Sequence, residues 1–97
     1  RAAARELAER DPALARDLRI GRPDLPHPYD DGGLVDVNSA PAAVLITELG
    51  LSDSEAAKVV RVREHLGAFR TCDDLVMLAG LGQLQVDRLA DRLVAVR

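Results

Sequence analysis

Two short hairpins contain the residues of this chain that are best suited to chemistry, and that chemistry is anion binding. Gly80-Leu81-Gly82 and Gly50-Leu51-Ser52 each precede a segment with helical spacing of its apolar residues. Glycine permits a tight turn and a close approach of the backbone. The free N–H groups at the start of the following helix attract an anion such as phosphate. We therefore expect any phosphate contact to lie at one of these hairpins.

The second hairpin is followed by a helical turn that contains no acidic residue. Gln83, Leu84 and Gln85 occupy that turn, and Arg88 lies further along the same helix, within reach of a phosphate. The same glycines would also suit a purely structural turn, because they permit close helix packing whether or not DNA is bound. The candidate DNA-binding residues are Gly80, Leu81, Gly82, Gln83, Gln85 and Arg88.

The first hairpin differs because Ser52 replaces the second glycine. Ser52 and Glu55 are spaced as a capping box, in which the hydroxyl accepts from one free amide and the carboxylate folds back onto another. Asp53 and Glu55 also place negative charge where a phosphate would otherwise bind. We predict that this hairpin caps itself and is structural. Its weaker binding candidates are Gly50, Leu51, Ser52, Ser54 and Lys58.

The other reactive side chains favour neither catalysis nor metal binding. Cys72 has only His27 and His65 beside it, with no zinc-ligand spacing. The carboxylate pairs Asp30-Asp31 and Asp73-Asp74 have no convergent partner in the sequence, so we interpret them as turn and cap residues. Cys72 lies just inside a predicted helix, a position that lowers a thiol pKa. We expect no enzyme activity, no cofactor, no metal and no small-molecule substrate.

The elements that position the hairpins are predicted to be helices. The chain has 97 residues, of which 47% are hydrophobic and only 2% aromatic, so its core must be small and aliphatic. Helices are expected over 1–10 and from Pro12 to about Ile20, the second capped by Asp11. Three prolines and Asp30-Asp31-Gly32-Gly33 then predict an ordered arm or linker without a strand.

Four further helices are expected after Asn38, with spacing that repeats. The first, capped by Asn38 or Ser39, ends at Gly50, and the second runs from Asp53 to Leu66. The third has Thr71 and Asp74 as a capping box and ends at Ala79, and the fourth begins after Gly82. The residues expected to face inward along the second and fourth helices are Ala56, Val59, Val60 and Leu66, then Val86, Leu89, Ala90 and Leu93.

A shift of 30 residues superimposes the two halves of this region, placing Leu45 on Leu75, Gly50 on Gly80 and Leu51 on Leu81. Such a repeat predicts two helix-hairpin-helix units packed around a pseudo-two-fold axis. Phe69 and Leu81 are expected to fill the core. The predicted fold is all-α, with a helical segment over 1–21, an arm or linker over 22–34 and a tandem domain over 35–97. The N-terminal helices lie against that domain or are detached from it.

Three segments resemble the helix-hairpin-helix domain of the bacterial competence DNA receptors (ComEA type). They are Val35-Asp36-Val37-Asn38-Ser39-Ala40, Arg63-Glu64-His65-Leu66-Gly67-Ala68-Phe69 and Gly80-Leu81-Gly82. The resemblance implies sequence-independent binding of double-stranded DNA through the hairpin amides, and Arg63 matches an arginine of the family. Ser52 departs from the family's pattern of glycines.

Charge favours an alternative function. The formal net charge is −3, and residues 23–55 contain seven acids and no lysine or arginine. A net-acidic chain is poorly suited to bind a polyanion. The alternative is a protein-interaction module with the same fold and little DNA affinity. It resembles the minor pseudopilin of type II secretion through Asn38-Ser39-Ala40-Pro41-Ala42-Ala43-Val44-Leu45.

The sequence leaves the cellular location open. It contains no apolar run long enough to span a bilayer, so we expect no membrane contact by these residues. The chain begins at Arg1 and is expected to be a fragment, of a protein that is either membrane-anchored or cytoplasmic.

Overall fold

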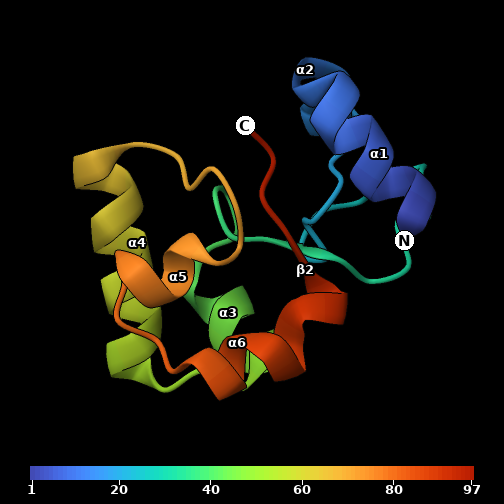
Figure 1. The fold of residues 1–97 in the computed structure, drawn as a ribbon. Helices are drawn as coiled ribbons and strands as arrows, with labels where there is room; N and C mark the ends of the chain where they lie inside the picture. Colours follow the sequence, from blue (N-terminus) through green and yellow to red (C-terminus); the bar gives the residue numbers. More distant parts are fainter.

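The computed structural model describes residues 1–97 and is almost entirely helical (Figure 1). The helices are α1 (Ala2–Arg10), α2 (Pro12–Asp17), α3 (Ala42–Leu49), α4 (Asp53–Leu66), α5 (Asp74–Met77) and α6 (Gln83–Leu89), with the 3-10 turn η1 (Ala90–Arg92). Two strands of two residues each, β1 (Val35–Asp36) and β2 (Leu93–Val94), complete the fold. The predicted all-α class is confirmed. None of the helices combines the length and the apolar character needed to cross a membrane.

The two N-terminal helices pack against the rest of the chain. Asp11 caps α2 as predicted, because its carboxylate accepts a hydrogen bond from the Leu14 amide at 3.1 Å. The helices α1 and α2 lie on one side of the molecule, and β2 runs between them and the other helices (Figure 1). A second hydrophobic core joins the two sides and consists of Ala4, Ala8, Ala15, Ile20, Leu34, Val94 and Val96.

The arm that follows is ordered and contains no strand before Val35. Asp30 accepts a hydrogen bond from the Gly32 amide at 2.9 Å, and Asp31 accepts one from the Gly33 amide at 3.0 Å. The buried Asp31 also accepts from the Gly21 amide at 2.7 Å. The predicted turn role of this carboxylate pair is confirmed, and Asp31 additionally ties the arm to the end of the α2 region.

The predicted 30-residue repeat is confirmed in the backbone of the two hairpins. Gly50 and Gly80 have φ angles of +70° and +71°. The Leu51 amide donates to the Leu45 carbonyl at 3.4 Å, and the Leu81 amide donates to the Leu75 carbonyl at 3.1 Å. The units α3–α4 and α5–α6 therefore turn in the same way at equivalent residues, although α5 is much shorter than α3.

The main hydrophobic core lies between these two units. Phe69 is 1% exposed and Leu81 is 5% exposed, so both are buried as predicted. Leu66 is 66% exposed, and the expectation that it is buried is wrong because the last turn of α4 extends past the core. Ala90 is also exposed, contrary to expectation, since the chain changes there from α6 to the tighter 3-10 turn η1.

The predicted cap of α3, Asn38 or Ser39, is wrong because both side chains make other contacts. Helix α3 begins at Ala42 after Pro41. The Asn38 side chain instead contacts the link between the two units. Its Oδ1 accepts from the Phe69 amide at 2.7 Å, and its Nδ2 donates to the Phe69 carbonyl at 3.0 Å. Neither Asn38 nor Ser39 caps α3, because tertiary contacts take their polar groups.

The capping box predicted at the start of α5 is also absent. Asp73 is the N-cap residue and makes no side-chain cap. The Asp74 carboxylate accepts from the Arg70 amide at 2.9 Å, outside the helix. The helix ends at Met77 and not at Ala79, so only one turn of it forms before the second hairpin.

The strand pair and one buried carboxylate close the module, and the sequence did not predict either role. β1 pairs with β2 in parallel, Val35 with Leu93 and Asp36 with Val94. Asp36 Oδ1 accepts from the amides of Asn38 at 3.0 Å and Val96 at 2.9 Å, and Oδ2 accepts from the Ser39 hydroxyl at 2.6 Å. Burial raises the pKa of Asp36. This carboxylate therefore joins the first and last segments of the module.

Candidate functional site

The two hairpins lie close to each other in the fold. Lys58 extends from α4 toward the second hairpin, and its Nζ lies 3.1 Å from the point that a Cβ atom on Gly80 would occupy. The Gln85 side chain helps to lower the pKa of the Glu55 carboxylate. Glu55 is the residue of the first unit that is equivalent to Gln85. Residues predicted from the separate hairpins therefore belong to one surface.

Four consecutive backbone amides at the end of the second hairpin have no partner within the protein. Gly82 is the N-cap of α6 and makes no side-chain cap. After the Leu81 amide, the next amide to be bonded is that of Val86, which donates to the Gly82 carbonyl at 3.0 Å. The N–H groups without an acceptor are those of Gly82, Gln83, Leu84 and Gln85. These donors lie at the N-terminal end of α6, which is where an anion binds to a helix.

The first hairpin uses two of its four equivalent amides internally. The Glu55 amide donates to the Ser52 hydroxyl at 3.1 Å, and the Ser52 amide donates to the Glu55 carboxylate at 2.8 Å. The predicted capping box is confirmed. The Ser52 amide, with the Gln85 side chain as the next contributor, lowers the pKa of Glu55, which is therefore ionised at neutral pH. Ser54 is exposed and makes no hydrogen bond through its side chain.

Gly80 and Gly82 have different reasons to be glycine. Gly80 has a φ of +71°, a conformation that L side chains rarely adopt, so the turn itself requires glycine there. Gly82 has a φ of −69°, and the nearest atom to a Cβ placed on it is 3.9 Å away. The fold therefore accepts a side chain at Gly82. The absence of one leaves the amides of the hairpin open to a ligand.

The polar side chains around the second hairpin differ in whether they already have a partner within the protein. Arg88 and Lys58 are exposed and make no ion pair. The half-buried Arg63 donates from Nη1 to the Val37 carbonyl at 3.1 Å and so connects α4 to the residues after β1. Gln83 donates to the Asp87 carboxylate at 2.9 Å, which turns its side chain along α6. Lys58 and Arg88 are the cations available to a ligand here.

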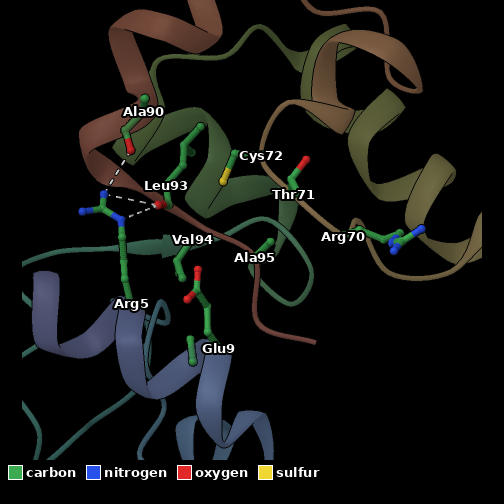
Figure 2. Close-up of a pocket in the computed structure, with 10 residues that line it drawn as sticks. Arg5, Glu9, Arg70, Thr71, Cys72, Ala90, Leu93, Val94 and Ala95 are labelled. Atoms are coloured by element: carbon green, nitrogen blue, oxygen red, sulfur yellow. Dashed lines mark hydrogen bonds between the residues drawn. The ribbon is translucent and has the colours of Figure 1, made fainter.

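Cys72 lies in a different place, a cavity of about 240 Å³ between α1 and the segment before α5. Figure 2 shows the thiol among Thr71, Leu93 and Arg5, whose guanidinium binds the Ala90 and Leu93 carbonyls. Burial raises the pKa of Cys72 to about 11. The expected lowering is wrong, because α5 begins at Asp74 and leaves Cys72 outside the helix.

Comparison with known proteins identifies the region that contains both hairpins. The sequence profile described as "Helix-hairpin-helix motif" matches residues 30–94. "Endonuclease/exonuclease/phosphatase family domain-containing protein 1" is 35% identical over 63 residues in Rattus norvegicus and in Homo sapiens, and 33% identical in Bos taurus. The match covers 65% of this chain and 11% of each relative. No solved structure gives a significant match.

Proposed function

Because the chain belongs to the helix-hairpin-helix motif family, whose motif is generally associated with nucleic-acid binding, we propose that it binds the backbone of double-stranded DNA through its second hairpin. The observation that supports this proposal most directly is the set of unpartnered amides from Gly82 to Gln85. Amide donors read phosphate oxygens and not base edges, so binding would be independent of sequence.

In this proposal the hairpin amides and two cations bind the DNA backbone together. The amides donate to its oxygens, and Lys58 supplies positive charge beside Gly80. Arg88, which has no partner in the protein, binds the same phosphate or the next one along the strand. The role of a DNA-uptake receptor, which the resemblance to the competence proteins implies, is the most specific form of this proposal.

Negative charge on the same surface should keep the affinity low. Glu55 is ionised and lies beside Gln85, and Asp53 occupies the first turn of α4. The whole chain has a formal net charge of −3. We therefore expect weak binding that depends strongly on salt, because the interaction relies on release of counterions at a few phosphates.

Gly82→Glu and Gly82→Gln test the proposal as a matched pair. Both side chains fit the φ of Gly82 and crowd the amides equally, but only Glu adds repulsion. We expect Gln to weaken binding and Glu to abolish it. The measurement is fluorescence anisotropy of a short random duplex at about 50 mM salt, where such binding is strongest.

Two results would contradict the proposal. If the parent chain does not bind at about 1 mM protein, it is weaker than ordinary non-specific binders and the DNA function is wrong. If the parent binds and both Gly82 variants bind equally well, the function stands but the second hairpin is not the site. Equivalent thermal unfolding of the three proteins controls for damage to the fold.

A protein-interaction module is the second candidate, and exposed apolar side chains of the second unit favour it. Met77 is 80% exposed, Leu84 is 71% exposed and Leu78 is 47% exposed. Apolar side chains with this exposure suit a protein partner better than they suit a phosphate backbone. Loss of partner binding in a Met77→Gln, Leu78→Gln variant that still binds DNA would support this second function in addition to the first.

The proposal is for binding and not for catalysis. The thiol of Cys72, the only cysteine in the sequence, has a pKa raised to about 11 and so stays protonated at neutral pH. The endonuclease/exonuclease/phosphatase name belongs to relatives of which this chain matches 11% of the length.

A further inference from the structure

Three arginines that lie outside the region covered by the family profile line a second cavity. The cavity has a volume of about 140 Å³ and lies between the chain after α2 and the segment before α3. Arg16, Arg19 and Arg22 line it, together with the hydroxyl-bearing Ser39. The three arginines are spaced three residues apart, from the end of α2 into the turns that follow it, and all three line the same cavity. None belongs to residues 30–94.

The guanidinium groups retain donors that the protein does not use. Arg16 is exposed and makes no hydrogen bond or ion pair through its side chain. Arg19 uses only Nη1, which donates to the Pro26 carbonyl at 2.6 Å. Arg22 pairs with Asp24 through Nε at 2.9 Å and Nη2 at 2.8 Å, which leaves Nη1 free. Since a guanidinium has five N–H donors, most of the donors here remain available.

The backbone at Arg19 supports a functional role for this cluster. Arg19 has a φ of +58° and is the only non-glycine residue of the chain with a positive φ. An arginine in this conformation is strained, whereas a glycine would not be. Strain of this kind is commonly kept at binding sites, where the side chain is needed.

Two carboxylates reduce the positive charge of the cavity but do not cancel it. Asp24 is engaged by Arg22. Asp36 lines the cavity and is 1% exposed, and its oxygens accept from Ser39, Asn38 and Val96. Three arginines against these two carboxylates leave a formal excess of one positive charge. A small concave site with that excess suits a compact anion better than an extended polyanion.

We propose that the cavity bounded by Arg16, Arg19 and Arg22 binds a terminal phosphate group, either free phosphate or the phosphorylated end of a nucleic-acid strand. A terminal phosphate presents three oxygens, and guanidinium groups bind such oxygens with charge-assisted hydrogen bonds. The phosphodiester of an unbroken strand has substituents on both sides and fits a concave site of this small volume poorly. The site is independent of the second hairpin.

Thermal unfolding of the full 97-residue chain tests this site in inorganic phosphate and in chloride at equal ionic strength. A ligand that binds only the folded state should raise the midpoint Tm by about 7 °C near ten times its Kd. We expect Arg16→Gln and Arg19→Gly to lose this rise. Arg61→Gln, an exposed arginine on α4 without an ion pair, is the matched control and should keep it.

The two test variants separate binding from structure. Arg16→Gln removes no contact within the protein, and Arg19→Gly removes a strained residue, so neither should lower Tm in chloride by more than the one Arg19 hydrogen bond contributes. An equal rise in all four proteins would mean that phosphate acts as a general stabilising salt, and the site would be wrong. The absence of any rise in the parent would also overturn it.

Measuring the binding of duplexes with and without 5′-phosphates distinguishes a strand end from free phosphate as the ligand. Tighter binding of the phosphorylated duplex, lost in Arg16→Gln, supports a strand end as the ligand. A Tm rise in inorganic phosphate without that preference supports free phosphate. Gly82→Glu should leave the Tm rise unchanged, so a failure of the hairpin proposal remains distinguishable from a failure of this one.

Discussion

At the scale of single residues, Asp36 shows how one buried carboxylate organises distant segments. Its three hydrogen bonds connect β1 to the start of α3 and to Val96 near the C-terminus. Burial nevertheless raises its pKa above the ordinary value of 3.8, because removal from water disfavours the charged form more than these donors favour it. The hydrogen bonds are therefore needed, but the negative charge is not.

We predict that Asp36→Asn folds as stably as the parent at pH 7, whereas Asp36→Ala loses about 2–4 kcal/mol because buried amides lose their acceptor. The Asn oxygen keeps both amide bonds, and its NH₂ donates to the Ser39 hydroxyl, which rotates to accept. Denaturant unfolding measures the difference. An equal loss in the two variants would show that the charge itself is required.

The raised pKa also sets the direction of a pH effect. A carboxyl whose folded pKa lies above its unfolded pKa contributes most stability below the unfolded value, and that contribution falls as pH rises through the folded value. The Asp36→Asn variant has no titrating carboxyl at this position and so lacks this pH-dependent contribution to stability. We expect its stability relative to the parent to increase as pH rises above about 4, the ordinary pKa of an aspartate. A constant difference across that range would contradict the assignment to Asp36.

At the scale of elements, the two hairpins share a backbone turn but differ in their chemistry. The φ and ψ angles at Ser52 are −71° and 163°, and those at Gly82 are −69° and 141°. Ser52 and Glu55 nevertheless satisfy two amides that the second hairpin leaves open. Because the backbone is the same, the side chains alone decide which hairpin can receive a phosphate.

Ser52→Gly with Glu55→Gln should therefore give the first hairpin the properties of the second. The double variant frees two amides and removes one negative charge beside Gln85. We expect DNA binding to tighten and the fold to lose about 0.5–1.5 kcal/mol from the weakened cap. Anisotropy and denaturant unfolding measure the two effects. Unchanged DNA affinity would show that the first hairpin does not approach the duplex.

At the scale of the whole molecule, two cores hold the chain together. One lies between the helix-hairpin-helix units, and the other joins α1, α2 and the C-terminal strand. Arg5 reinforces the second by donating to the Ala90 carbonyl at 3.0 Å. Phe69 lies in the link between the units, where Asn38 bonds both its amide and its carbonyl.

Phe69→Ala and Leu81→Ala should each reduce the free energy of unfolding by about 2–5 kcal/mol, because each side chain is buried in a small core. Met77→Ala is the matched control, since Met77 is 80% exposed and should change stability little. Urea unfolding at fixed pH measures all three. A loss below about 1 kcal/mol at either core position would contradict its role in packing.

The sequence by itself determined the features that neighbouring residues decide. Helical periodicity and the 30-residue repeat predicted the two units and their hairpins, and the Ser52–Glu55 capping box involves residues only three apart. Such local patterns form through contacts within one or two helical turns, so they are visible in the order of residues. The burial of Phe69 and Leu81 was predicted from their places in the link between the units and in the second hairpin.

The tertiary structure alone decided the features that join distant residues. Asn38 does not form its predicted helix cap because its side chain is hydrogen-bonded to Phe69, 31 residues away. Asp36 likewise accepts a hydrogen bond from an amide 60 residues away. Lys58 lies beside Gly80, and burial reverses the expected pKa shift of Cys72. These outcomes depend on which elements pack together and how deeply they bury each polar group. The residues that flank a position in the sequence do not contain that information.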